Sequence, residues 1–223
     1  MPKSLGQDWP TYQIGPRESV FAIGVASTKF TELESVLCFL FATVFRIGSD
    51  DATMIVAKVG NIAAVILMEQ KLDRPSREEL AIGEIKPKTA LAIAMEDHVR
   101  HFIKGFHVCA SNRDHLMHSG LAWTGRDEGD TILFKTSKQG DTTISLPEPG
   151  KLRAVADGMD CYAHYGRAAA NAINIRLASD PPAVPFPWPD KPPLPHKLEY
   201  KSDRLQPQET RQGKPRRPRS SRA

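Results

Sequence analysis

A short stretch of the chain gathers residue types that can bind phosphate and move protons. Arg113 is followed by Asp114 and, five positions after the arginine, by His118, while Asn112 and His115 lie in the same stretch. An arginine can donate paired hydrogen bonds to a phosphate, and a histidine side chain can act as a general acid or base near neutral pH. Arg113 and His118 are therefore the first candidates for chemistry.

The element that must position this stretch is predicted to be a helix over residues 89–116. Its apolar seam repeats at alternating spacings of four and three residues: Met95, Val99, Phe102, Phe106, Cys109, Arg113 and Leu116. Such spacing is typical of the buried face of a bundle helix. Arg113 thus stands where an apolar residue is expected, and a buried guanidinium is costly unless it is paired.

Two outcomes are open for Arg113. Either the helix ends at this point and the guanidinium reaches water, or a counter-charge meets it inside the bundle. Glu34 is the candidate counter-charge, because it is an acid among the apolar residues of an earlier predicted helix. The alternative for Glu34 is a place at the edge of the apolar stripe, from which its carboxylate reaches water.

The run Arg113-Asp114 with His118 resembles the Arg–x4–6–His motif of the HEPN superfamily, which lies at the end of a helix in a helical bundle. The resemblance covers residues 18–178, and segments 30–34 and 109–113 look like those of uncharacterised bacterial proteins. It implies a metal-independent endoribonuclease or RNA-binding module of the toxin or defence type. It also implies a homodimer with facing motifs, no cofactor, and an antitoxin-like protein as a further partner.

Under this resemblance His118 is the expected acid–base group, Arg113 the phosphate clamp, and Asp114 or Asn112 the orienting residue. The expected supporting residues are Asn112, His115 and Glu34. The alternative is a non-enzymatic interaction or structural bundle, in which the Asn112-Arg113-Asp114-His118 cluster is a structural polar network. Cations at a helix C-terminus are favourable against the helix dipole and can bond its last carbonyls, which supports that alternative.

Histidines are dense in the same predicted helix: His98, His101, His107, His115 and His118. His98 and His101 are three residues apart with Asp97 nearby, a spacing at which two imidazoles can meet one metal ion. The sequence nevertheless contains neither an HExxH run nor paired Glu-x-x-His motifs. We therefore predict no metal site, and expect these histidines to lie exposed on the polar face of the helix.

Periodicity predicts four main helices, over residues 18–46, 51–71, 89–116 and 151–177. β-branched runs at 131–136 and 142–146 predict a hairpin, and 121–130 is predicted to be a loop. Short connections make neighbouring helices antiparallel. The predicted fold is mostly α, an antiparallel four-helix up-down bundle with a small β-hairpin between the third and fourth helices and an extended Pro-rich C-terminal tail.

The predicted turn between the first two helices depends on Gly48 as the helix stop, with Ser49 or Asp50 as the next N-cap. In the second helix the predicted inward residues are Ile55, Val59, Ile62 and Ile66. Gly60, in the middle of that helix, is either a weak spot or a place of close helix contact.

The composition divides the chain into four parts. Residues 1–17 form an irregular lead-in, 18–178 the helical bundle, 179–196 a Pro-rich strap and 197–223 a basic tail that we expect to be disordered. Eleven of the 18 prolines lie after residue 180. The strap can lie extended on the body, with Phe186, Trp188 and Leu194 as its expected anchors.

The formal net charge of +4 conceals an uneven distribution. Residues 197–223 contain nine basic and three acidic residues, so that the remainder of the chain is slightly acidic. Attraction to a polyanion such as RNA should therefore come mostly from the tail.

Neither a membrane span nor a secretory signal is recognisable, and we expect a cytoplasmic protein. The three cysteines, Cys38, Cys109 and Cys161, each fall in an apolar helical pattern and form no CxxC pair. We expect them to be buried free thiols. Loops typical of nucleotide binding or acyl transfer do not occur in the sequence, which argues against those reactions.

Overall fold

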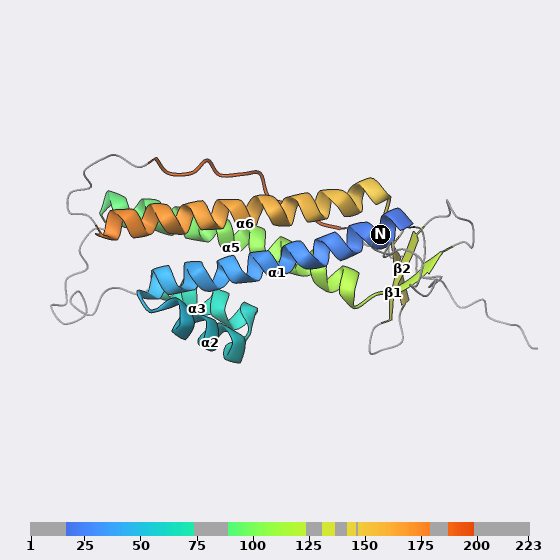
Figure 1. Cartoon of the computed structure of the whole chain (residues 1–223), viewed down its shortest axis with the longest axis horizontal. Coiled ribbons are helices and arrows are strands. Elements are labelled where there is room, and N and C mark those ends of the chain that lie inside the picture. The colour runs from blue at the N-terminus through green and yellow to red at the C-terminus, as the bar shows by residue number, and fades with distance from the viewer. Residues whose placement is uncertain are drawn as a thin grey trace, which may run out of the picture.

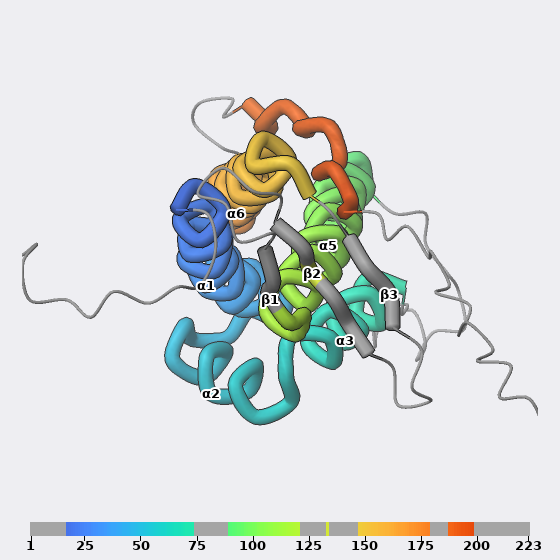
Figure 2. Tube along the Cα trace, turned by 90° about the vertical axis from the view of Figure 1, so that its right-hand side faces the viewer, coloured from blue at the N-terminus to red at the C-terminus, as the bar shows by residue number. Residues whose placement is uncertain are grey.

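A computed structural model describes residues 17–73, 89–123, 131–136, 142–145, 147–178 and 187–198. Three long helices lie side by side: α1 (Arg17–Phe45), α5 (Ala90–Met117) and α6 (Pro149–Ala178). The helix α5 runs antiparallel to α1 and α6, and Figure 2 shows the three nearly end-on. The predicted mostly α class is confirmed.

The core lies between these three helices. The seam predicted for α5 is buried at Val99, Phe102, Phe106, Cys109 and Leu116, each at most 4% exposed. Opposite this seam lie Leu33, Leu37 and Leu40 of α1 and Met159, Tyr162 and Ile173 of α6, all of them at most 1% exposed. Spacings of three and four thus predicted the inward face of α5 correctly.

Two glycines allow α5 and α6 to approach closely. A Cβ at Gly105 would lie 1.8 Å from Cε1 of Tyr162, and a Cβ at Gly166 would lie 2.4 Å from Cε2 of Phe102. A larger residue at either glycine position would therefore collide with one of these two aromatic rings. Two ion pairs join α1 to α6: Lys29 pairs with Asp160, and Arg153 pairs with Glu18.

The single helix predicted over 51–71 is wrong. The segment forms α2 (Ser49–Val59) and α3 (Asn61–Asp73), which are bent by 118° at Gly60. Gly60 has a φ of +85°, a left-handed conformation that glycine adopts without steric cost. The glycine therefore ends one helix, and the chain turns there into the next.

The bend changes which side chains face the core. Ile55, Val59, Ile62 and Ile66, predicted to point inward, are 39–51% exposed. The buried residues are instead Ala52, Val56, Ala64, Val65, Met68 and Leu72. A continuous helical wheel could not predict this set, because the break resets the phase of the second half.

The end of α1 also differs from the prediction. Arg46, rather than a glycine, adopts the left-handed conformation with a φ of 54°. The N–H of Ile47 donates to the carbonyl of Ala42 at 3.1 Å, which closes the helix in the manner of a Schellman motif. Gly48, the predicted stop, is the N-cap position of α2.

Three antiparallel strands follow α5 in the order β1-β2-β3. They are β1 (Gly120–Trp123), β2 (Thr131–Thr136) and β3 (Thr142–Ser145). The loop prediction is wrong for β1, in which Leu121 pairs with Leu133 of β2. Leu133 is 1% exposed and joins the core. The turn predicted between β2 and β3, at 137–141, lies outside the described residues.

A segment without regular secondary structure, residues 187–198, runs back along α5 and is called the strap below (Figure 1, red-orange). Of its three expected anchors, Trp188 packs against the core, Leu194 is 53% exposed and Phe186 lies outside the described residues. Leu198, which was not among the expected anchors, is buried at 6% exposed. Residues 1–16 of the predicted lead-in and residues 199–223 of the predicted tail also lie outside the described residues.

Within the described ranges, no single helix has both the length and the apolar composition needed to cross a membrane. The bent pair α2–α3 meets that test only when its two helices are taken together.

Candidate functional site

Three of the predicted site residues meet at the C-terminal end of α5. Nη1 of Arg113 lies 3.1 Å from Oδ1 of Asp114 and 3.4 Å from Nε2 of His118. The distance from His118 Nε2 to Asp114 Oδ1 is 3.9 Å. The side chains of Arg113, Asp114 and His118 are 38%, 60% and 61% exposed. This trio, called the polar cluster below, is accessible to a ligand.

The end of the helix explains why these side chains converge. α5 ends at Met117, and His118 is its C-cap, with a φ of −107° and its N–H bonded to the carbonyl of Asp114. His118 therefore leaves the helical path and can reach a residue five positions earlier. Cζ of Arg113 lies 5.8 Å from the ring centroid of Phe30 on α1, a cation–π distance that holds the guanidinium at the rim of the core.

Glu34 is not the counter-charge of Arg113. Its Oε1 accepts a hydrogen bond from Nδ2 of Asn61 at 2.5 Å, and the ion pair of Arg113 is with Asp114. Asn61 is the first residue of α3, so the bend at Gly60 supplies the partner that Glu34 needs. Arg113 can occupy a position on the apolar seam because α5 ends nearby and the guanidinium reaches solvent, and not because a buried acid pairs with it.

Asn112 serves a different part of the molecule from Arg113. Its Nδ2 donates to the carbonyl of His196 at 2.8 Å, and its Oδ1 accepts from the N–H of Leu198 at 2.9 Å. Both ends of a side chain that is 1% exposed are thus engaged by the strap. Of the two expected orienting residues, Asp114 is the one that contacts Arg113. His115, expected beside the cluster, is 2% exposed and belongs to the interior.

Two of the five histidines expected on an exposed polar face, His98 and His101, instead contact the strap, whereas His107 and His118 are exposed as predicted. His98 is 7% exposed, and its ring stacks on Trp188 with centroids 4.6 Å apart and planes 10° apart. Cζ of Arg176 lies 4.1 Å from the centroid of the same tryptophan ring. Burial, followed by the nearby charge of Lys191, lowers the pKa of His98.

Further along the strap, the carbonyl of Pro192 is bonded by two side chains. His101 Nε2 donates to it at 2.9 Å, and the hydroxyl of Tyr162 donates at 3.5 Å. Because a carbonyl only accepts, His101 must carry a proton on Nε2. His101 and Tyr162 also lie within 2.9 Å of each other. Burial raises the pKa of Tyr162 to about 12, so it remains a neutral donor.

The cysteine prediction is correct only in part. All three thiols are free, but Cys109 is buried, Cys38 is half-buried and Cys161 is exposed. Burial raises the pKa of Cys109 to about 12, which leaves its thiol protonated and unreactive at neutral pH. Across the described residues, no three His, Cys, Asp or Glu side chains are grouped so that they could hold a metal ion.

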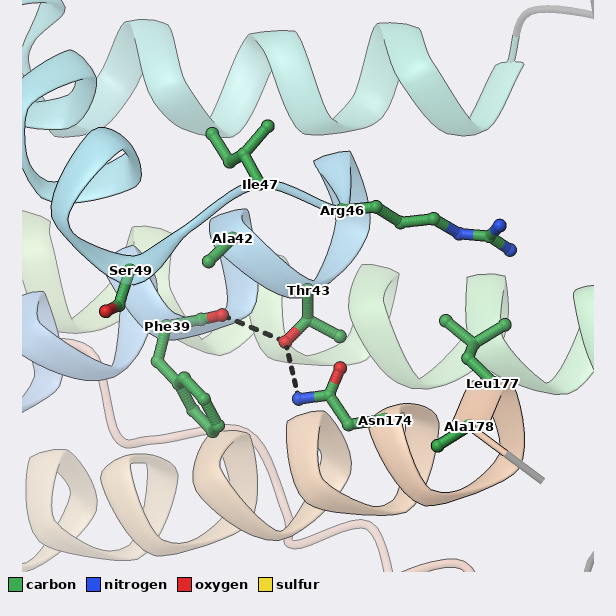
Figure 3. A pocket seen from close by; sticks show the side chains of 9 residues that line it. All are labelled: Phe39, Ala42, Thr43, Arg46, Ile47, Ser49, Asn174, Leu177 and Ala178. Carbon is green, nitrogen blue, oxygen red and sulfur yellow. Dashed lines mark hydrogen bonds between the residues drawn. The ribbon is translucent and has the colours of Figure 1, made fainter.

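A hollow of about 470 Å³ lies where the C-terminal ends of α1 and α6 meet the start of α2. Asn174 Nδ2 donates to Thr43 Oγ1 at 3.1 Å, and that hydroxyl donates to the carbonyl of Phe39 (Figure 3). Arg46 is the one charged residue among its nine lining residues, all of which are described. Since an acid–base pair is lacking there, the polar cluster is the better candidate for chemistry.

Comparison of the chain with models of known protein families, with curated proteins and with solved structures gives no match. The resemblance to the HEPN motif therefore stays a prediction, and the function must be argued from the polar cluster itself.

Proposed function

We propose that this protein is a HEPN-like endoribonuclease that cleaves RNA without a metal ion at the polar cluster. One observation carries the proposal: Arg113, Asp114 and His118 lie within 3.1–3.9 Å of one another while their side chains stay 38–61% exposed. A cation, a carboxylate and an imidazole in contact with solvent are what phosphate chemistry by acid–base catalysis requires.

The proposed reaction uses the 2′-hydroxyl of the RNA as the nucleophile. Its oxygen attacks the adjacent phosphorus, the bond from phosphorus to the 5′-oxygen breaks, and the products are a 2′,3′-cyclic phosphate and a 5′-hydroxyl. A neutral imidazole takes the proton of the 2′-hydroxyl, and a protonated imidazole gives one to the departing 5′-oxygen. Arg113 donates to the phosphate oxygens as negative charge develops on them.

Asp114 has two roles in this scheme. Its ion pair with Nη1 of Arg113 keeps the guanidinium at the end of α5. Its Oδ1 is also 3.9 Å from His118 Nε2, where a carboxylate stabilises the protonated imidazole. One chain supplies a single His118, so the proposal includes a homodimer in which two polar clusters provide the base and the acid.

The point from which the basic tail continues supports RNA as the substrate. Asn112, the residue before Arg113, accepts a hydrogen bond from the N–H of Leu198, which is the last residue of the strap. The chain therefore continues beyond the strap from a point beside Asn112. Residues 197–223 contain nine basic and three acidic residues. Cations attached at this point raise the local concentration of a polyanion near the polar cluster.

A specific observation favours a second candidate function, a non-enzymatic interaction module. Arg113 contacts Phe30 and Asp114, contacts that also suit a structural polar network at a helix end. On this account the surface of α5 and α6 that contacts the strap is the functional surface, and the polar cluster only terminates α5.

The chemistry of the substrate tests the proposal. Purified full-length protein with a chelator should cleave a short RNA to a cyclic phosphate and a 5′-hydroxyl, identified by mass spectrometry. The same oligonucleotide with a single 2′-deoxy sugar should resist cleavage at that linkage, because its nucleophile is missing. Cleavage at the deoxy linkage, or RNA left intact and unbound by folded protein, would overturn the proposal.

A further inference from the structure

The strap is held along its length by side chains of α5 and α6 rather than by apolar packing alone. Trp188 stacks on His98, and Lys191 forms an ion pair with Asp97. At the other end, the backbone of the strap is bonded by Asn112. The strap groove, as the term is used below, consists of the α5 and α6 residues that contact the strap: Asp97, His98, His101, Asn112, Gly158, Tyr162 and Arg176.

The strap groove recognises the backbone of an extended chain. Pro192 and His196 accept hydrogen bonds at their carbonyls from His101 and Asn112, and Leu198 donates its N–H to Asn112. A proline-rich segment suits this arrangement, since proline has no N–H to leave unsatisfied and is already extended. Several peptide-binding domains hold proline-rich segments in grooves in this way and exploit their preformed extended conformation.

The groove also selects side chains by their chemistry. Trp188 contacts both the imidazole of His98 and the guanidinium of Arg176, and Asp97 selects a cation three residues later in the strap. Gly158 leaves room for Pro195, because a Cβ at position 158 would lie 3.1 Å from Cβ of Pro195. Leu198 ends the pattern as a buried apolar residue.

We propose that the strap groove is a recognition site for an extended proline-rich peptide and that the strap is a ligand held within the same chain. The ligand class has an aromatic residue, a lysine three positions later followed by proline, and a leucine seven positions after the lysine. This inference does not rest on the proposed ribonuclease activity. It requires the strap to bind as a separate peptide as well.

The test converts the strap into a separate molecule. A protease cleavage sequence is inserted between residues 178 and 187 of the full-length chain, and the folded protein is then cut there. We expect the C-terminal fragment to remain bound in size-exclusion chromatography and the body to keep its helical circular dichroism. An excess of synthetic peptide 187–198 should displace the fragment with saturable behaviour. A fragment that separates at once, that is not displaced by the peptide, or whose cutting unfolds the body would overturn the proposal.

Two variants of the peptide sharpen the result. Trp188→Ala removes the contacts with His98 and Arg176, and it should weaken binding to the cut protein by at least about tenfold. Leu194→Ala is the matched control, because Leu194 is 53% exposed and its loss should change binding by less than about twofold. Equal affinities of the two variants would contradict specific recognition by the groove.

Discussion

Nη1 of Arg113 lies 3.4 Å from Nε2 of His118 at the open end of α5. The guanidinium can only donate, so this contact requires an imidazole whose Nε2 is free of a proton. Protonation of Nε2 would turn the contact into a repulsion and favour the carboxylate of Asp114, which is 3.9 Å away. The two protonation states of His118 therefore prefer different neighbours, as an acid–base group in this cluster would need.

Replacing Arg113 by alanine distinguishes an arginine in an exposed cluster from an arginine in a buried ion pair. The side chain of Arg113 is 38% exposed, and it contacts a neighbouring carboxylate, Nε2 of His118 and the ring of Phe30. Contacts of this kind contribute about 1 kcal/mol in total, so Arg113→Ala should lower the free energy of unfolding by that amount in urea titrations. A loss of several kcal/mol would indicate a buried charge pair, as in the earlier expectation for Glu34.

Asn112 should matter more for stability than its neighbour. Asn112→Ala leaves the carbonyl of His196 and the N–H of Leu198 without their partner, at a cost of about 1–3 kcal/mol. We expect faster amide hydrogen exchange at Leu198, measured by NMR. Ser111→Ala changes an exposed residue of the same helix and is the control. Equal exchange in both variants would show that Asn112 does not hold the strap.

Stability should fall in mild acid because of His98. Burial lowers the pKa of this histidine in the folded protein below its ordinary value of 6.5. The charges of Lys191 and Arg176 and the imidazole of His101 act in the same direction, and Asp97 opposes them. The unfolded chain then binds more protons than the folded chain as the pH drops below 6.5, so the free energy of unfolding decreases.

Denaturant titrations at neutral and mildly acidic pH measure this effect. His98→Phe keeps an aromatic ring against Trp188 but cannot be protonated, so it should show a smaller decrease between the two pH values. His107→Ala removes an exposed histidine of the same helix and should keep the decrease of the native protein. An unchanged pH dependence in His98→Phe would assign the effect to another group.

A pair of glycines provides a test of the packing between α5 and α6. Gly105→Ala forces the ring of Tyr162 to move, because the new Cβ would lie 1.8 Å from Cε1, and should cost about 1–3 kcal/mol. Gly24→Ala on α1 meets nothing within 4 Å and should instead stabilise the helix by up to about 1 kcal/mol. Melting temperatures that move in the same direction for both variants would contradict this account of the helix contact.

Local pattern was sufficient for the long helices and their seam. Val99, Phe102 and Phe106 recur at the spacing of one helix face, and burial of that face follows directly. The bounds of α1, α5 and α6 also agree with their predicted ranges to within about two residues, the usual uncertainty of helix ends. These features depend on neighbours that are close in sequence.

The parts that sequence reasoning missed depend on neighbours that are distant in sequence. His98 and His101 have the polar types of an exposed face, but they contact Tyr165 and Tyr162 of α6 and the strap some 90 residues later. Asn112 appeared to belong with Arg113 because the two are adjacent, although its partners are His196 and Leu198. Gly60 marked a weak spot, but its left-handed φ, which bends the chain and gives Glu34 its partner, could not be read from composition.

The cleavage rate of a single-site fluorogenic RNA tests the central claim most directly. It is measured in the presence of a chelator with the native protein and with His118→Ala and His107→Ala, each checked for native circular dichroism. General acid–base catalysis is worth about 10²–10⁴-fold, so His118→Ala should lower the rate by at least about a hundredfold while His107→Ala retains it. A folded His118→Ala variant that cleaves at the native rate, or a native protein that leaves the RNA intact, would contradict the assignment of the polar cluster as a ribonuclease site.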